Sequence, residues 1–247
     1  MGHAAAHGLA VVTGASSGIG AALARRLAHR GQPVLAVARR EDRLEALSAE
    51  GRALAAPIHA LALDLAARGA PERLLEEARR LGGATWLVNN AGFGAYGPVT
   101  GQDPARLGAM VRLNCEALAV TTALFLPDLL AARRGVVLNV ASAAGFQPTP
   151  YMAVYGATKA FVLSFSEALR EELARASARV TVTAFCPGPV ATEFGEVAGY
   201  RARLRDPPGR LSADRAARAA LAAADRGAPV AIPGTWNRAA VLASRLL

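Results

Sequence analysis

The stretch LAVVTGASSGIG (Leu9–Gly20) decides the fold class of this chain. Its first residues form a short apolar run of the kind found in a buried strand. A turn with three glycines follows, and after it apolar side chains recur at helical spacing until Gly31 closes the pattern. The stretch therefore predicts a strand, a tight turn and a helix in immediate succession.

The same alternation continues along the chain. Further strands are expected at 33–38, 58–65, 85–92, 135–142, 179–188 and 229–233, and further helices at 41–50, 70–82, 104–133, 154–174 and 212–224. Strands that are apolar throughout and separated by helices indicate a parallel sheet covered on both faces. We therefore expect one α/β domain over residues 1–247, a Rossmann-type doubly wound sheet of about seven strands that binds ligands beyond their carboxyl ends.

The bulk composition narrows the class of protein. Of the 247 residues 53% are hydrophobic, which is enough for a sizeable core. No apolar run reaches the roughly 18 residues of a membrane span, and the N-terminus lacks the form of a signal peptide. We therefore expect a cytoplasmic protein without a membrane span. Cys115 and Cys186 have no Cys or His at metal-ligand spacing, so no metal site is expected.

The net charge of +9 raises the question of a nucleic-acid partner. The arginines, however, are scattered through helical segments beside acids, and no basic block with interleaved aromatic residues appears. A compositional preference for arginine on solvated faces explains the charge, so no nucleic-acid binding is expected.

The glycine turn predicts a dinucleotide site. Glycines allow backbone amides to approach a pyrophosphate, and the helix N-terminus adds partial positive charge. The second expected strand ends AVARRED, so Arg39 and Arg40 are its first polar residues. An acid there would accept a hydrogen bond from the ribose 2′-hydroxyl and favour NADH, whereas a guanidinium pairs with a 2′-phosphate. We expect NADPH rather than NADH; the alternative is that both arginines are ordinary surface residues.

Four further features follow in order. They are NNAG at Asn89–Gly92, Ser142 at the end of the fifth strand, YGATK at Tyr155–Lys159, and PGPVAT at Pro187–Thr192. Together with TGASSGIG, this order and spacing resembles the classical short-chain dehydrogenase/reductase (SDR) family. The resemblance is strong from about residue 9 to residue 192 and weak beyond it.

The resemblance implies a role for each matched position. Asn114 matches a helix asparagine that holds a proton-relay water, and Ser142, Tyr155 and Lys159 match the catalytic residues. The cofactor-binding positions are Gly14, Ser16, Ser17, Gly18, Ile19, Gly20, Asp64, Leu65, Asn90, Ala91, Gly92, Tyr155, Lys159, Pro187, Gly188, Val190 and Thr192.

The chemistry of hydride transfer explains these residue types. A carbonyl that accepts a hydride becomes an alkoxide and must take a proton. Tyrosine titrates near about 10, and a nearby cation lowers that pKa. Lys159 lies four residues after Tyr155, on the same helix face, and is the single lysine among 28 basic residues. Ser142 can donate to the developing charge. The alternative is an ordinary helix pair.

The substrate side is less defined. An apolar cavity is expected from Phe93, Tyr96, Phe146, Tyr151, Met152 and Phe194, with Tyr200 nearby. It favours a neutral, fairly hydrophobic ketone, aldehyde or secondary alcohol. The glycine- and arginine-rich segment 193–210 is a candidate substrate lid. Its arginines are also suited to the phosphate of an acyl carrier or of CoA. A reductase of 3-oxoacyl thioesters is therefore a further possible function.

Three functions remain open at this stage. The leading one is an NADPH-dependent carbonyl reductase. The second is an oxidative alcohol dehydrogenase that uses the same site, and the third is a cofactor-sensing regulatory protein without turnover. The resemblance also implies a homodimer or homotetramer through helices 104–133 and 154–174.

Overall fold

The centre of the molecule is a parallel sheet. The computed structural model describes residues 8–132, 134–200 and 209–246. Seven strands pair in the order β3-β2-β1-β4-β5-β6-β9, each parallel to its neighbours. Their bounds are β1 Leu9–Thr13, β2 Val34–Ala38, β3 Ile58–Ala62, β4 Ala84–Asn89, β5 Gly135–Val140, β6 Val180–Phe185 and β9 Val230–Ala231. The predicted doubly wound α/β fold is confirmed.

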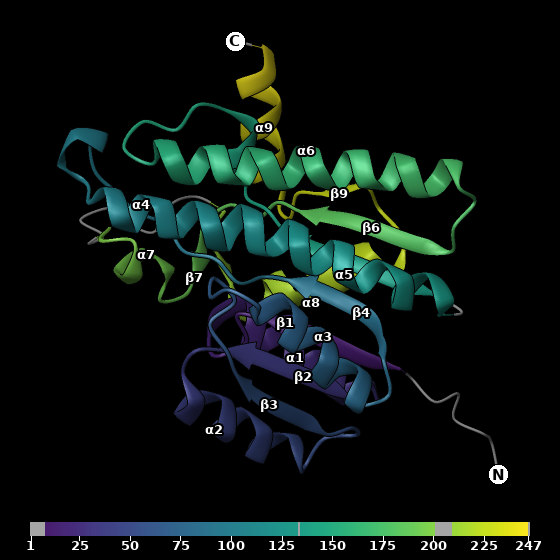
Figure 1. Cartoon of the computed structure of the whole chain (residues 1–247). Helices are drawn as coiled ribbons and strands as arrows, with labels where there is room; N and C mark the ends of the chain where they lie inside the picture. Colours follow the sequence, from purple (N-terminus) through teal and green to yellow (C-terminus); the bar gives the residue numbers. More distant parts are fainter. Residues whose placement is uncertain (1–7, 133, 201–208, 247) are drawn as a thin grey trace.

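Helices cover both faces of this sheet (Figure 1). One layer contains α1 (Gly18–His29), α2 (Glu41–Gly51) and α8 (Ala213–Asp225), and the other contains α3 (Ala70–Arg80), α5 (Leu118–Ala131) and α6 (Ala153–Arg175). Alternate residues of β1 point to opposite layers. Ala10 and Val12 pack against the first layer, and Leu9 and Val11 against the second. Because both faces are buried, the strands are apolar throughout.

The expected long helix at 104–133 has three parts. These are α4 (Pro104–Val111), a π-helical turn η2 (Arg112–Ala117) and α5. The combined helix is long and apolar enough to span a membrane by length and composition alone, a criterion that core helices of soluble proteins also meet. Of its most apolar 18-residue window, 44% is buried inside the structure. Since Phe125 and Leu129 of α5 lie in the core beneath the sheet, the helix has the surroundings of a core helix.

The chain after Pro187 contains short elements that the sequence pattern does not reveal. Strands β7 (Val190–Ala191) and β8 (Leu211–Ser212) pair in parallel, and α7 (Phe194–Val197) lies between them in sequence. The last described helix is α9 (Thr235–Leu246). Two short 3-10 helices, η1 (Val99–Gly101) and η3 (Ala143–Phe146), lie earlier in the chain. Of the candidate lid, residues 201–208 lie outside the described part of the chain.

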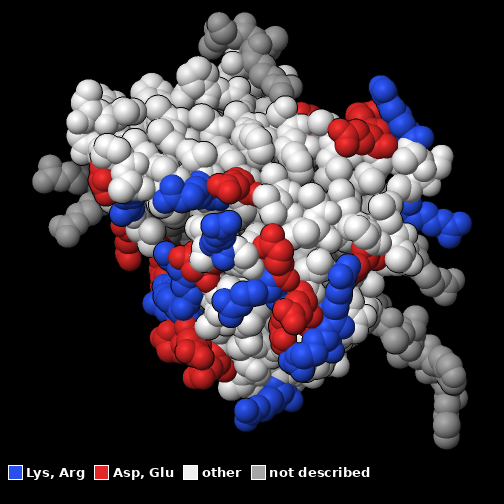
Figure 2. Space-filling model, viewed as in Figure 1, with Lys and Arg blue, Asp and Glu red and all other residues white. Residues whose placement is uncertain are grey.

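Charged residues of both signs are mixed on the face shown in Figure 2. Arginines pair with acids between elements, as in Arg25–Glu50, Arg26–Asp214 and Arg79–Asp128. The surface over α5 and the middle of α6 is largely uncharged in the same view.

Candidate active site

The glycine loop lies where the strand order reverses, between β1 and β4. The Asn90 side-chain amide donates to the carbonyls of Thr13 at 2.9 Å and Gly14 at 3.2 Å. The Thr13 hydroxyl in turn accepts hydrogen bonds from the backbone N–H groups of Asn90 and Ala91, both at 3.0 Å. The NNAG motif therefore fixes the start of the loop at the topological switch point, where such sheets bind ligands.

Two loop glycines have left-handed backbone conformations that favour glycine, with φ of 67° at Gly14 and 55° at Gly18. A Cβ at Gly14 would lie 2.8 Å from the Ala91 Cα, and one at Gly18 would lie 2.9 Å from the Thr192 Cγ2. The first turn of α1 has no acidic residue, and the N-cap Ser17 side chain does not cap it. A glycine-rich loop at an uncapped helix N-terminus fits a dinucleotide pyrophosphate.

Arg40 is bound directly to this loop. Its guanidinium donates to the Ser16 hydroxyl at 3.0 and 3.2 Å and to the Ser17 hydroxyl at 2.9 Å. It also pairs with the Glu193 carboxylate at 2.8 Å. Arg39, by contrast, is exposed. The structure thus separates the two predicted arginines, because only Arg40 of the two lies against the glycine loop.

The predicted catalytic side chains gather at the carboxyl end of β5. Tyr155 and Lys159 are buried on α6, 8% and 6% exposed. The Lys159 ammonium donates to the Val140 carbonyl at 2.8 Å and lies 5.8 Å from the centre of the Tyr155 ring. Ser142, just beyond β5, forms a side-chain hydrogen bond with Tyr155, and its hydroxyl accepts from the Ala144 N–H at 3.1 Å.

Burial controls the protonation of this pair. It raises the pKa of Tyr155 to about 12, and the hydrogen bond with Ser142 opposes that rise. Burial also lowers the pKa of Lys159 to about 8. The sequence argument expects a lowered tyrosine pKa. The direction is opposite here because loss of solvation disfavours the phenolate more than neighbouring groups favour it.

Asn114 lies in the π-helical turn η2 and is 1% exposed. Its amide NH₂ donates to the Phe93 carbonyl and the Thr158 hydroxyl, both at 3.0 Å, and its carbonyl accepts from the Phe93 N–H at 3.2 Å. The Thr158 hydroxyl donates to the Tyr155 carbonyl at 2.8 Å. Asn114 therefore connects the loop after β4 to the first turn of α6, the helix that carries the tyrosine.

The expected apolar wall divides into three groups. Phe93, Met152 and Phe194 pack against the cluster that Tyr155 forms with Ala95 and Met110, and the Phe194 ring lies 5.1 Å from the Tyr155 ring. A second group consists of surface tyrosines: Tyr96 lies 5.9 Å from Tyr151 and 4.9 Å from Tyr200, and Tyr96 and Tyr151 are exposed. Phe146 packs instead against the cluster formed by α6, β6 and the start of α5, because the turn of η3 carries it away from Tyr155.

The other predicted cofactor positions lie around the same sheet edge. Asp64, after β3, is exposed and accepts the Ala66 N–H at 3.0 Å, whereas the Leu65 side chain is buried in the core. Gly92 faces the catalytic cluster, since a Cβ there would lie 3.6 Å from the Lys159 ammonium. Remaining positions follow β6: the Pro187 carbonyl accepts the Ala143 N–H at 2.9 Å, Gly188 adjoins Asn237, Val190 is in β7 and Thr192 meets Gly18.

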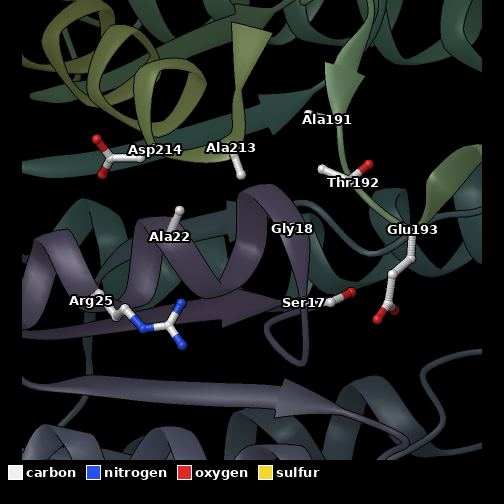
Figure 3. Close-up of a pocket in the computed structure, with 9 residues that line it drawn as sticks. All are labelled: Ser17, Gly18, Ala22, Arg25, Ala191, Thr192, Glu193, Ala213 and Asp214. Atoms are coloured by element: carbon white, nitrogen blue, oxygen red, sulfur yellow. The ribbon is translucent and has the colours of Figure 1, made fainter.

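A pocket of about 430 Å³ opens beside the glycine loop. Its lining comes from the first turns of α1, from the segment after β7 and from the start of α8 (Figure 3). Figure 3 shows the Glu193 side chain extending from the segment after Thr192 toward the loop, beside Ser17. A second pocket of about 360 Å³ lies between residues 95–106 and α7.

Several contributors to the site receive no role from the sequence alone. Thr13 and Thr158 lie inside the quoted motifs TGASSGIG and YGATK, but only the structure shows the hydrogen bonds that they form. Arg43 and Glu193 are ordinary surface types, yet they pair with each other across 150 residues of sequence. Only the fold brings them together.

Comparison with known proteins gives a consistent family assignment. A family profile described as short chain dehydrogenase matches residues 8–200. The NADP-dependent 3-hydroxy acid dehydrogenase of Salmonella typhi is 36% identical over 201 residues, which cover 76% of this chain and 75% of that protein.

Two solved structures extend the comparison. A short-chain dehydrogenase from Sphingobium yanoikuyae in complex with NADPH has a TM-score of 0.85 at 33% identity, covering 97% of this chain and 94% of that one. The 3-ketoacyl-(acyl-carrier-protein) reductase from Brucella melitensis, complexed with NADH, has a TM-score of 0.79 at 30% identity, with 91% and 95% covered.

Proposed function

The chain belongs to the short-chain dehydrogenase family, and from that premise we propose that it is an NADPH-dependent reductase of carbonyl compounds. The observation that carries this proposal is the cluster of the buried Tyr155 and Lys159 with the half-buried Ser142, at the same sheet edge as the glycine loop. The coarser statement, an oxidoreductase of a family that uses nicotinamide cofactors, follows from the relatives.

The protonation state of Tyr155 favours reduction. A phenol with a pKa of about 12 keeps its proton at neutral pH and can donate it. When bound, the nicotinamide cofactor supplies the hydride to the carbonyl carbon. Tyr155 then gives its proton to the substrate oxygen, and the Ser142 hydroxyl donates a hydrogen bond to that oxygen as negative charge develops.

Lys159 and Asn114 support this proton transfer without contacting the substrate oxygen themselves. The lysine is held at the Val140 carbonyl, and we propose that it shifts to a ribose hydroxyl and to the tyrosine once the cofactor is in place. Asn114, through Thr158, holds the helix turn of Tyr155, and we propose that it also orders a relay water.

The cofactor preference rests on Arg40. It is the guanidinium that lies against the loop hydroxyls, so it is suited to a 2′-phosphate. The relatives do not decide this point, since one neighbour holds NADPH and another holds NADH. Arg39, Asp64 and the remaining matched positions are proposed as secondary contacts.

The substrate proposed is a neutral, fairly hydrophobic ketone or aldehyde, or a 3-oxoacyl compound. Support comes from the Phe93, Met152 and Phe194 side chains that pack against the cluster containing Tyr155. The similar proteins include one named for 3-hydroxy acids and one for 3-ketoacyl groups. The oxidative direction, with the same residues, is the alternative.

We also propose that the chain acts as one cytoplasmic domain and assembles as a homodimer or homotetramer. Apolar side chains are exposed on α5 and α6, among them Val120, Leu130 and Phe161. The exposed Phe161 ring stacks on Phe165 with ring centres 6.0 Å apart, and Phe165 packs against the core.

A substrate screen tests the proposed function. The purified chain is supplied with NADPH or NADH and a panel of hydrophobic ketones, aldehydes and 3-oxoacyl thioesters, and cofactor oxidation is followed by absorbance. We expect turnover with at least one carbonyl class and faster turnover with NADPH. Cofactor binding without turnover on any compound would favour the sensor function, and a clear preference for NADH would overturn the role of Arg40.

A further inference from the structure

The Glu193 carboxylate lies between two arginines. One of its oxygens pairs with Arg40 at 2.8 Å, and the other pairs with Arg43. Glu193 comes directly after Thr192, which contacts Gly18, and directly before Phe194, which packs on Tyr155. The carboxylate is therefore held at the border between the glycine loop and the catalytic cluster.

Arg40 uses the rest of its guanidinium on the glycine loop. It donates to the hydroxyls of Ser16 and Ser17 while it pairs with Glu193. An arginine at the end of β2 beside loop hydroxyls is the group that the proposed function assigns to the 2′-phosphate. The structure places an anion from the chain itself on that arginine.

We propose that Glu193 is a specificity-determining residue that competes with the 2′-phosphate of the dinucleotide for Arg40 and Arg43. This inference rests on the proposed cofactor site. When NADPH binds, the phosphate takes the two guanidinium groups and the carboxylate moves into solvent. NADH has no group that needs these arginines, so it leaves the Glu193 contacts intact.

Exposure makes this exchange feasible. The side chains of Arg40, Arg43 and Glu193 are 41%, 42% and 36% exposed, and exposed ion pairs contribute little to stability. A phosphate monoester carries roughly 1.5 to 2 negative charges at neutral pH. The 2′-phosphate therefore displaces the single Glu193 carboxylate from Arg40 and Arg43. Because it must displace that carboxylate, it binds less tightly than it would to arginines without an acidic partner.

Glu193 can compete with the 2′-phosphate throughout the neutral pH range, because its carboxylate stays charged there. The hydrogen bonds from Arg40 and Arg43 lower the pKa of Glu193 to about 2, so the carboxylate is ionised throughout the neutral range. The opposite role is a carboxylate that only aligns the two arginines for the phosphate. The two roles predict opposite effects when the charge is removed.

The experiment compares wild type, Glu193→Gln and Glu196→Gln by titration calorimetry. The ligands are adenosine 2′,5′-bisphosphate, which carries the 2′-phosphate, and 5′-AMP, which lacks it. Glu196 is the matched control, an exposed acid in α7, the short helix that begins directly after Glu193. We expect Glu193→Gln to tighten the bisphosphate about three- to tenfold and to leave 5′-AMP unchanged. Glu196→Gln should change neither by more than about twofold.

Three results would overturn the inference: unchanged bisphosphate binding in Glu193→Gln, weaker binding, or an equal change for both ligands. Adding Arg40→Gln and Arg43→Gln should remove the gain, and thermal melting checks that each variant is folded. Failure of the proposed cofactor preference is distinguishable, because wild type would then bind the bisphosphate no more tightly than 5′-AMP.

Discussion

The Lys159 ammonium donates a hydrogen bond to the Val140 carbonyl at 2.8 Å, joining α6 to the end of β5. The bond holds the single lysine of the chain in a buried position, 5.8 Å from the Tyr155 ring centre. A compact ammonium with three donors fits there, whereas a planar guanidinium needs more space and a different arrangement of acceptors.

Replacing this lysine by arginine should therefore impair the enzyme although the charge is kept. We expect Lys159→Arg to lower kcat at least about a hundredfold. Arg175→Lys, an exchange of the same two residue types at the exposed end of α6, is the control and should leave kcat unchanged. If Lys159→Arg keeps a kcat close to that of wild type, the proposal that this position requires lysine is wrong.

The buried lysine should also appear in the pH dependence of stability. Its pKa is about 8 when folded and 10.5 when solvated. Between these values the unfolded chain binds more protons, so this residue makes the free energy of unfolding rise with pH. Its contribution is complete above about 10.5 and is lost as the pH falls through about 8.

Lys159→Met removes that titration. Urea denaturation measures the free energy of unfolding of the variant and of wild type at each pH. The value for Lys159→Met minus the value for wild type should fall by about 2 kcal/mol from pH 7.5 to pH 10. A difference that stays constant across this range would show that the lysine is not desolvated in solution.

Asn114 should act mainly through the elements it joins. Asn114→Ala leaves the Phe93 N–H and carbonyl without their partner, which should cost about 2 kcal/mol of stability as well as activity. Thr158→Ala removes one acceptor of the same network and should cost less. Thermal unfolding and kcat of both variants test this order; equal losses would contradict it.

The close contact of Gly18 with Thr192 should determine nucleotide affinity. Gly18→Ala combines an unfavourable φ of 55° with a Cβ 2.9 Å from the threonine side chain. Gly69→Ala is the matched control, because its φ is 74° and nothing lies within 4 Å of the added Cβ. Both variants should lose about 1 kcal/mol of stability.

Only Gly18→Ala should also weaken NADPH binding, by about tenfold or more, because the loop and the segment at Thr192 must separate. Calorimetric titration of the two variants measures this. Equal affinities would mean that the contact does not shape the cofactor site.

The sequence predicts the fold because the sheet is buried on both faces. Continuous apolar runs such as β1 and β5 leave little choice of structure, and the loops that carry the motifs follow directly from the strand ends. The expected strands at 58–65 and 179–188 are too long, since their last residues leave the ladder to form site loops.

Other features depend on relationships that a linear pattern does not encode. The π-helical turn η2 around Asn114 interrupts a segment that the sequence predicts as one continuous helix at 104–133. The direction of the Tyr155 pKa depends on burial by α7 and by the loop after β4, whereas the sequence shows only the neighbouring lysine. Glu193 and Arg40 are 153 residues apart, so their pairing appears only in the fold.

The central claim is that Tyr155 protonates the substrate oxygen. Tyr155→Phe keeps the ring that packs on Phe194 and removes only the hydroxyl. With the best carbonyl from the substrate screen, the most direct test measures kcat and the NADPH dissociation constant of this variant. We predict a fall in kcat of about a thousandfold or more, with NADPH affinity within about twofold of wild type. A variant that keeps most of its kcat would contradict the mechanism.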